Sequence, residues 1–269
     1  MLVEEHNWEF LQVERKGRVL TVRFDGGNKV NALSNALMRE LIALPQMLED
    51  DAELSAVVLM GQDSIFSGGM DLKDPDNVRV RDMTVAQRRK LVQLGPRMCA
   101  AWEAIEPVTI AAIEGWCVGG GMALISACDW RVASTQTQLY VPELRLGMNM
   151  SWQSVPRFVS LIGPAKTKQL LILAEPLDAS TAHQWGLVDY LAEPGNCYAM
   201  AMELADKVAA MPPIPVRMAK QGINKAANAL NDATSFMDAD QFLLAQATED
   251  AVEGPRAFFE KRAPKFEGN

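Results

Sequence analysis

The chain has 269 residues, of which 49% are hydrophobic and 22% are charged. This composition is sufficient for a substantial buried core and excludes an intrinsically disordered chain. The formal net charge of −8 argues against nucleic acid or an anionic membrane as the main partner, because proteins that neutralise phosphate groups carry an excess of Lys and Arg.

The N-terminal residues MLVEEHNWEF carry acidic side chains where a secretory signal peptide has positive charge, and no apolar segment follows them. The longest apolar stretch, residues 108–128, is interrupted by Glu114 and four glycines, which argues against a membrane span. We therefore expect a cytoplasmic protein that does not bind membranes.

Neither the four cysteines nor the two histidines have the spacing of a metal site, so we expect no metal and reduced, structural cysteines. His6 and His183 lie outside every motif described below. This argues against a nucleophile activated by histidine.

Short apolar strands and an amphipathic helix are predicted in the first part of the chain. Residues 19–24 (VLTVRF) are rich in β-branched side chains, and Ser34 is a suitable N-cap for a helix that continues to about Asp50. The wholly apolar runs 56–60 (AVVLM) and 108–113 (VTIAAI) predict strands that are covered on both faces.

One long helix is predicted between these two apolar strands, from Thr84 to Pro107, because its apolar residues are spaced three and four apart. After residue 121, MALISACDW predicts another helix. WRVAS (130–134) and QLYV (138–141) then predict two strands.

Helices dominate the rest of the chain. We expect them at residues 151–173, 179–186, 195–210, 213–229 and 233–260, with one strand at 187–191. The chain thus divides into an α/β part, residues 1–195, and a helical tail, residues 196–269. No obvious linker separates them, so we expect the tail to pack on the first part or on another subunit.

Two glycine-bearing turns follow predicted strands: FSGGMDL at 66–72 and GWCVGGG at 115–121. Glycine costs roughly 0.5–1 kcal/mol relative to alanine inside regular structure, so such clusters need a compensating role. GWCVGGG fits neither the dinucleotide fingerprint nor the phosphate-binding loop. The alternatives are tight turns without chemistry, or two strand ends whose backbone N–H groups converge on one oxygen as an oxyanion hole.

The pairing of FSGGMDLK with PVTIAAIEGWCVGGGMALISACD, followed by YVPELRLGM and GLVD, resembles the enoyl-coenzyme A hydratase/isomerase, or crotonase, superfamily. The resemblance extends from NKVNAL to AFFEKRAPKF. It implies a crotonase-like α/β spiral of strand-strand-helix units, with a helical C-terminal segment that mediates assembly into trimers or dimers of trimers. It also implies an acyl-CoA thioester substrate and no separate cofactor.

The same resemblance assigns the backbone N–H groups of Met70 and Gly120 to an oxyanion hole for the thioester oxygen. The remaining substrate-binding positions that we expect in these two turns are Ser67, Gly68, Asp71, Leu72 and Gly119.

Glu143 in PELRLG matches one of the two glutamates that members of this family place around the substrate, although most glutamates are simply solvated. If Glu143 works near neutral pH, an apolar pocket should raise its pKa. Met70, Met122, Met148 and Met150 are candidates to line that pocket. The other glutamate is missing, because Ala123 occupies its position.

Three further positions follow from the resemblance. Ser151 and Trp152 replace a small, glycine-rich turn that leaves room for water in other members. Ser151 is a candidate donor to substrate or water, and Trp152 either closes the acyl pocket or fills a gap. Lys261 matches a position that reaches the phosphates of coenzyme A, often in a neighbouring subunit, but it also fits an ordinary solvated surface.

These features predict an enzyme that stabilises a thioester enolate and moves a proton with Glu143 alone. The missing glutamate at Ala123 favours double-bond isomerisation, whereas hydration is the commoner reaction in the family. The alternatives are decarboxylation or carbon–carbon cleavage of a coenzyme A thioester, and a non-catalytic binding protein on the same scaffold. RNA binding is disfavoured by the net negative charge.

Overall fold

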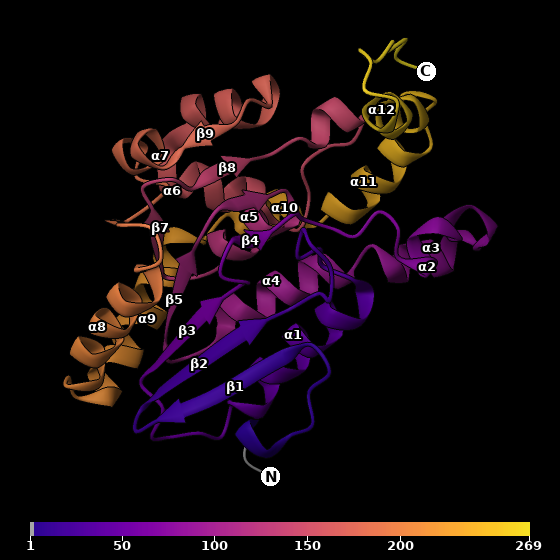
Figure 1. Cartoon of the computed structure of the whole chain (residues 1–269). Helices are drawn as coiled ribbons and strands as arrows, with labels where there is room; N and C mark the ends of the chain where they lie inside the picture. The colour runs from indigo at the N-terminus through magenta and orange to yellow at the C-terminus, as the bar shows by residue number, and fades with distance from the viewer. Residues whose placement is uncertain (1–2) are drawn as a thin grey trace.

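Two β-sheets form the framework of the molecule in the computed structural model, which describes residues 3–269 (Figure 1). The larger sheet has the order β1-β2-β3-β5-β7-β10, and only the β1 and β2 pair is antiparallel. Its strands are β1 Leu11–Lys16, β2 Val19–Phe24, β3 Ala56–Met60, β5 Val108–Ile113, β7 Trp130–Ser134 and β10 Tyr190–Ala192. The smaller sheet contains β4 Ile65–Ser67, β6 Trp116–Val118, β8 Gln138–Tyr140 and β9 Leu177–Asp178.

The chain repeats one unit three times. The pairs β3 and β4, β5 and β6, and β7 and β8 each place their first strand in the larger sheet and their second strand in the smaller one. Helices follow each pair before the chain returns to the larger sheet. The predicted α/β class is confirmed, and the strands predicted at 19–24, 56–60, 108–113 and 130–134 have those bounds.

Strand β3 is buried on both faces, as its apolar run predicts. Val57 and Leu59 belong to one hydrophobic cluster, whereas Val58 belongs to a second. Successive side chains of a strand point to opposite faces, so each face of the larger sheet needs its own cover. Helices α1 (Asn35–Met47) and α4 (Leu94–Ala104) belong to the first cluster, and α8 (Cys197–Ala209) packs on the second face.

Ser34 caps α1 as predicted, since its side chain accepts a hydrogen bond from the N–H of Leu37 at 3.1 Å. The single long helix predicted from Thr84 is wrong. The structure has two helices there, α3 (Val85–Leu91) and α4. Pro96 explains the break, because a proline ring clashes with the carbonyl four residues earlier, at Val92.

The C-terminal region is helical, as predicted, but its boundaries differ. From residue 154 onward the helices are α6 Ser154–Lys168, a π-helical turn Gln169–Leu173, α7 Ala179–Trp185, α8, α9 Pro213–Ala227, α10 Asn231–Ser235, α11 Asp238–Gln246 and α12 Asp250–Phe259. The predicted helix 233–260 is therefore three shorter helices. The short helical elements earlier in the chain are Val3–Glu5, α2 Pro75–Val78, Val80–Asp82, α5 Gly120–Ser126 and Glu143–Leu146.

Helix α12 lies directly against the helical turn Glu143–Leu146. A Cβ atom on Gly254 would lie 2.3 Å from the carbonyl carbon of Leu146, and one on Gly147 would lie 2.3 Å from the carbonyl oxygen of Asp250. Only glycine permits this approach of two backbones. The C-terminal tail thus packs on the first part of the chain. Among residues 3–269 we find no helix that is both long and apolar enough to span a bilayer.

Trp102 on α4 locks that helix to α1. Its side chain is 0% exposed, and its indole N–H donates to the carbonyl of Leu41 at 2.9 Å. We expect Trp102→Ala to lower the free energy of unfolding by about 3–5 kcal/mol, because it leaves a large cavity and an unpaired carbonyl. Urea unfolding measures this. Val85→Ala, at a side chain that is 71% exposed, should change it by less than about 0.5 kcal/mol. A loss at Trp102 as small as the control's would contradict this packing.

Candidate active site

Three neighbouring strands of the smaller sheet end at one edge. Strands β4, β6 and β8 run parallel, with Ser67 beside Cys117 and Val118 beside Tyr140. The segments that leave these strands therefore start side by side. Met70, Gly120 and Glu143 each lie two or three residues beyond a strand end, so the sheet brings together residues from three distant parts of the sequence.

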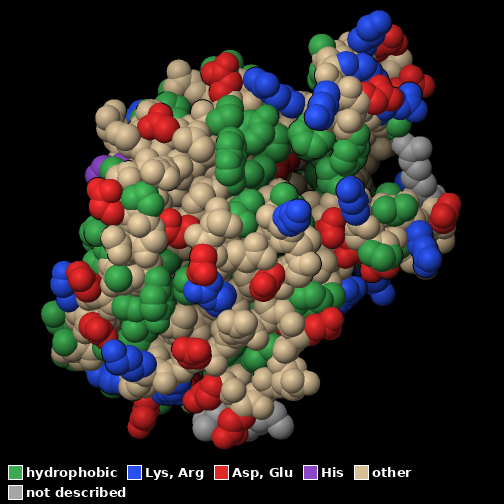
Figure 2. Space-filling model, viewed as in Figure 1, with side chains coloured by type: hydrophobic (Ala, Val, Ile, Leu, Met, Phe, Trp, Pro, Cys, Tyr) green, Lys and Arg blue, Asp and Glu red, His purple; other side chains and the backbone are tan. Residues whose placement is uncertain are grey.

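A cavity of about 90 Å³, which we call the reaction cavity, lies at this edge. Of the predicted site residues, those that line it are Gly68, Met70, Leu72, Gly119, Gly120, Glu143, Ser151 and Trp152. Residues that the sequence interpretation did not include also line it: Gly69, Val118, Pro142, Leu146, Asn149 and Phe242. In the space-filling view, hydrophobic side chains border a hollow beside the projecting C-terminal helices (Figure 2).

Four predicted residues do not line the reaction cavity. Ser67 is buried and shapes the first turn, because its hydroxyl donates to the carbonyl of Asn31 and accepts from the N–H of Gly69. Asp71 accepts from the N–H of Lys73 at the far side of that turn. Ala123 is 0% exposed within α5, and Lys261 is exposed beyond the end of α12.

Three of the four methionines that were candidates to line the apolar pocket do line the reaction cavity. Met148 and Met150 both line the reaction cavity, as Met70 does. Met122 is buried in the core of α5 instead.

The N–H groups of Met70 and Gly120 have no acceptor among residues 3–269. Leu33 donates to the carbonyl of Gly69 at 2.8 Å and accepts from the N–H of Asp71 at 3.0 Å. In such a parallel bridge the residue between these two partners directs its own N–H away from Leu33. Gly120 is the first residue of α5, where an N–H has no partner within the helix.

Glycines allow the two turns and Glu143 to meet. A Cβ on Gly69 would lie 3.4 Å from the nitrogen of Gly120 and 2.9 Å from the carbonyl oxygen of Val118. Gly119 has φ +50°, and a Cβ there would lie 2.6 Å from Oε1 of Glu143. The clustered glycines of both motifs therefore provide close backbone approach.

Glu143 supplies the only carboxyl group among the lining residues that the structure describes. Its Oε2 atom is shielded from solvent and has no hydrogen-bond partner in residues 3–269. Burial raises the pKa of Glu143 to about 7, because the charged form loses its hydration and gains little in return. A carboxyl group with this pKa can both accept and release a proton near neutral pH.

Helix α11 holds the segment that carries Ser151 and Trp152. Asp238, which is 8% exposed, accepts from the hydroxyl of Ser151 at 2.7 Å and from the N–H of Gln153 at 3.1 Å. Burial raises the pKa of Asp238 although these donors oppose the shift. No sequence signal identified Asp238 or the lining residue Phe242, since both lie about 90 residues after Ser151.

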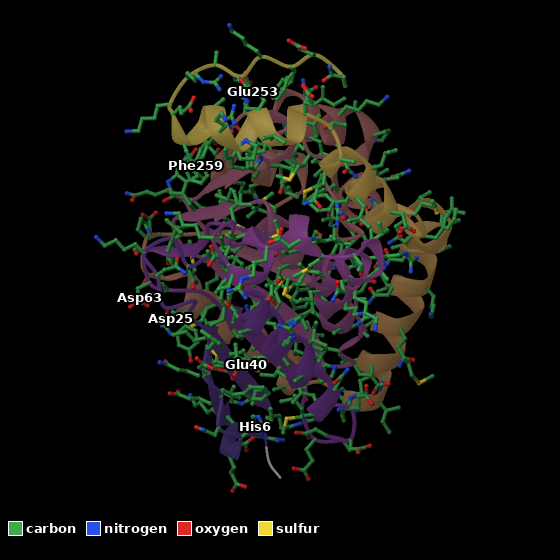
Figure 3. The ribbon with its side chains drawn as sticks, turned by 90° about the vertical axis from the view of Figure 1, so that its right-hand side faces the viewer. His6, Asp25, Glu40, Asp63, Glu253 and Phe259 are labelled. Atoms are coloured by element: carbon green, nitrogen blue, oxygen red, sulfur yellow. The ribbon has the colours of Figure 1, made fainter. Side chains whose placement is uncertain are left out.

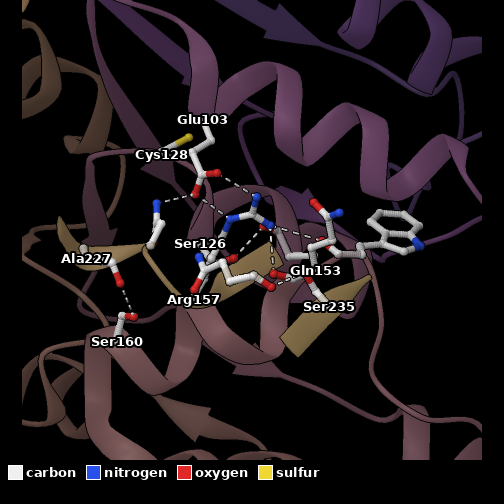
Figure 4. A network of polar contacts seen from close by, with 12 residues as sticks. Glu103, Ser126, Cys128, Gln153, Arg157, Ser160, Ala227 and Ser235 are labelled. Carbon is white, nitrogen blue, oxygen red and sulfur yellow. Dashed lines mark hydrogen bonds and ion pairs between the residues drawn. The ribbon is translucent and has the colours of Figure 1, made fainter. Parts of the chain in front are cut away.

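Arg157 also holds this segment. Its guanidinium donates to the carbonyls of Trp152 and Gln153 at 3.2 and 3.0 Å, and it forms a two-point ion pair with Glu103 of α4 (Figure 4). Arg157 is 4% exposed, so its carbonyl contacts compensate for burial of the charge. Together, Asp238 and Arg157 fix the backbone of residues 151–153.

None of the histidines and cysteines within residues 3–269 lines the reaction cavity. His6 lies at the end of the molecule opposite α12, which carries Glu253 and Phe259 (Figure 3). All four cysteines are buried free thiols, and burial raises the pKa of Cys99 and of Cys128 to about 12. No group of three potential metal ligands occurs in the part of the chain that the structure describes.

Comparisons with known proteins agree with this architecture. A family model described as enoyl-CoA hydratase/isomerase matches residues 14–269. The short-chain-enoyl-CoA hydratase of Clostridium acetobutylicum is 30% identical over 257 residues, covering 95% of this chain and 96% of that protein. The 2,3-dehydroadipyl-CoA hydratase of Escherichia coli is 29% identical, covering 96% and 98%.

Solved structures agree as well. A crystal structure of enoyl-CoA hydratase/isomerase from Pseudoalteromonas atlantica is 25% identical and superposes with a TM-score of 0.84, covering 96% of this chain and all of that one, 100%. An enoyl-CoA hydratase from Mycobacterium avium has the same TM-score of 0.84 at 21% identity, covering 96% and 98%. The crotonase-like fold that was expected is confirmed.

The raised pKa of Glu143 predicts a pH-dependent effect of Glu143→Gln on stability. The folded-state pKa of about 7 exceeds the usual value of 4.5, so ionising Glu143 costs the folded protein stability as pH rises between these values. Glu143→Gln removes this cost. Its free energy of unfolding relative to wild type should rise by roughly 3 kcal/mol between pH 4.5 and pH 8, at about 1.4 kcal/mol per pKa unit.

Urea unfolding of both proteins across this pH range tests the effect. Glu175→Gln, at an exposed glutamate, is the matched control and should show no such trend. A difference between Glu143→Gln and wild type that stays constant with pH would mean that the folded protein leaves the pKa of Glu143 unshifted.

Proposed function

The chain belongs to the enoyl-CoA hydratase/isomerase family, whose activity is on coenzyme A thioesters, and we propose that it moves the double bond of an enoyl-CoA substrate. The observation that carries this proposal is that the reaction cavity offers one carboxyl group, Glu143, with a pKa of about 7. Moving a double bond requires one group to take a proton from one carbon and return it to another. Coenzyme A enters as part of the substrate, and no separate cofactor is required.

In the proposed reaction, Glu143 removes a proton from C2 of a 3-enoyl thioester. The electron pair of the broken C–H bond delocalises into a dienolate, whose negative charge lies largely on the thioester oxygen. Protonated Glu143 then returns the proton to C4, which leaves a 2-enoyl thioester. Water takes no part, and the carboxylate is regenerated.

We propose that the N–H groups of Met70 and Gly120 stabilise the dienolate by donating to the thioester oxygen. Their lack of any acceptor within residues 3–269 supports this role, because unpaired backbone N–H groups in a cavity are rare. Loss of one donor of this kind typically raises the barrier by about 2.7–4 kcal/mol. The remaining lining residues of the two turns then contact the thioester, and Ser151 contacts the acyl group.

Hydration is the second candidate, because the relatives named above are called hydratases. Addition of water across a double bond is served best by two acidic groups that hold the water between them. Ala123, where the family places the other glutamate, is buried and does not line the reaction cavity. The indole of Trp152 lies against neighbouring Gly120 in this region, which favours isomerisation over hydration.

We further propose that the protein assembles into trimers or dimers of trimers through its C-terminal helices. Helix α9 exposes Ile214, Met218 and Ile223, each at least 66% accessible to solvent. Large apolar side chains exposed on one helix support contact with another subunit. Within such an assembly, Lys261 can reach the coenzyme A phosphates of a neighbouring subunit.

Light scattering should give at least three times the chain mass for wild type, and a smaller mass for Met218→Glu. A monomeric wild type would refute assembly.

The catalytic proposal predicts that Glu143→Gln loses isomerase activity. We expect kcat to fall at least 100-fold on a 3-enoyl-CoA substrate, since a positioned acid–base group typically contributes 100- to 10,000-fold. Binding of a saturated acyl-CoA should persist. The measurement is a product analysis in deuterated water with 2-enoyl, 3-enoyl and β-keto thioesters. Glu175→Gln is the control and should behave like wild type.

The products distinguish the alternatives. A 3-hydroxyacyl product formed faster than the isomer would establish hydration as the main reaction. Loss of carbon dioxide or of an acyl fragment from the β-keto thioester would establish decarboxylation or carbon–carbon cleavage. No turnover and no deuterium exchange with any thioester would indicate a binding protein.

A further inference from the structure

A second cavity lies beside the reaction cavity and shares a wall with it. This side cavity has a volume of about 240 Å³ and extends between α1, α3 and the C-terminal helices. The residues that line both cavities are Met70, Leu72, Met148, Trp152 and Phe242. All five are apolar, and Trp152 is the largest of them.

The indole of Trp152 spans the wall from one cavity to the other. A Cβ on Gly95, which lines the side cavity, would lie 2.0 Å from Cε2 of the indole. A Cβ on Gly120, which lines the reaction cavity, would lie 2.4 Å from Cζ3 of the same ring. The indole is therefore held between Gly95 and Gly120, and a side chain at either glycine would overlap the ring.

The backbone that carries the indole is rigidly held. Trp152 and Gln153 adopt φ values of +62° and +57°, which residues with a side chain rarely occupy. Strain of this kind persists only where the surroundings impose it. Here Asp238 accepts hydrogen bonds from Ser151 and Gln153, and Arg157 donates to the carbonyls of Trp152 and Gln153. The indole is thus a fixed partition rather than a mobile side chain.

The side cavity suits an alkyl chain. Arg88 is its only charged lining residue in the part of the chain that the structure describes, and the Nε–H of Arg88 donates to the carbonyl of Met83. Most other lining residues are aliphatic or aromatic, among them Met38, Leu91 and Phe259. Burying an alkyl chain there is favourable by about 0.8 kcal/mol per CH₂ group.

We propose that Trp152 determines the acyl-chain length that this protein accepts, by separating the reaction cavity from an apolar side cavity that would hold a longer chain. The inference rests on the proposed function. A cavity of about 150 Å³ holds the six carbon atoms of benzene. The reaction cavity, at about 90 Å³, therefore accommodates a short acyl group of about four carbons. The side cavity is large enough for several more.

The test compares kcat/KM for four-carbon and eight-carbon enoyl-CoA substrates. Wild type should prefer the four-carbon substrate. Trp152→Ala should shift the ratio of the two kcat/KM values toward eight carbons by roughly tenfold or more, since each methylene group in an apolar pocket changes selectivity by about 10- to 200-fold. Trp185→Ala, the same change at a tryptophan that lines neither cavity, should leave the ratio at the wild-type value.

A second substitution keeps the proposal testable if Trp152→Ala does not fold. Gly95→Ala adds a methyl group that displaces the indole into the reaction cavity, so KM for the four-carbon substrate should rise. In the Trp152→Ala background, where folded, Gly95→Ala should have little effect, because the indole is gone.

An unchanged chain-length ratio in Trp152→Ala, or an unchanged KM in Gly95→Ala, would overturn the partition while leaving the enzymatic proposal intact. Absence of turnover by wild type on either substrate would instead overturn the proposed function.

Discussion

The parallel alignment of β4, β6 and β8 is the constraint on which the rest of the site depends. Because the register places Ser67 beside Cys117 and Val118 beside Tyr140, the three chain segments leave the sheet at the same edge. The segments are then so close that a Cβ on Gly69 would collide with the backbone of Val118, and a Cβ on Gly119 with the carboxyl group of Glu143. The close spacing of the strands thus requires glycines in these turns. It also brings the N–H groups of Met70 and Gly120, which have no acceptor within residues 3–269, to the same edge of the sheet.

The C-terminal helices both pack on the core and contribute residues to the candidate site. Helix α11 contributes Asp238, which anchors Ser151, and Phe242, which lines the reaction cavity. Helix α8 covers one face of the larger sheet. Residues from both sides of the division expected near residue 195 therefore pack in one hydrophobic cluster and line one cavity.

The sequence predicted most reliably what depends on local pattern. Apolar runs gave β3 and β5 their bounds, because strands buried on both faces need apolar side chains throughout. Ser34 was identifiable as a cap from its position alone. The break before α4 was also local, and the information was present in Pro96. The short strands β4, β6 and β9 escaped prediction, because two or three residues show no periodicity.

The site divides in the same way. Resemblance pointed to Glu143, Met70 and Gly120 through motifs that lie within strand-end turns. The sequence could not predict the roles of Asp238 and Gly95. Each residue acquires its role only through a partner far away in the chain, which is Ser151 for Asp238 and Trp152 for Gly95. The sequence shows that Trp152 is bulkier than the small turn that other family members have at this position. Only the three-dimensional structure shows that its indole lies between Gly95 and Gly120.

The contact between α12 and the turn Glu143–Leu146 has a mechanical consequence. Gly254 and Gly147 leave no clearance between the two backbones, and the last residues of the chain fold back onto α12, where Asp250 accepts from the N–H groups of Glu267 and Gly268. The last residues of the chain therefore help to hold α12 in place against the helical turn that begins at Glu143. The positions of α12 and of this turn are coupled, because neither backbone can move toward the other.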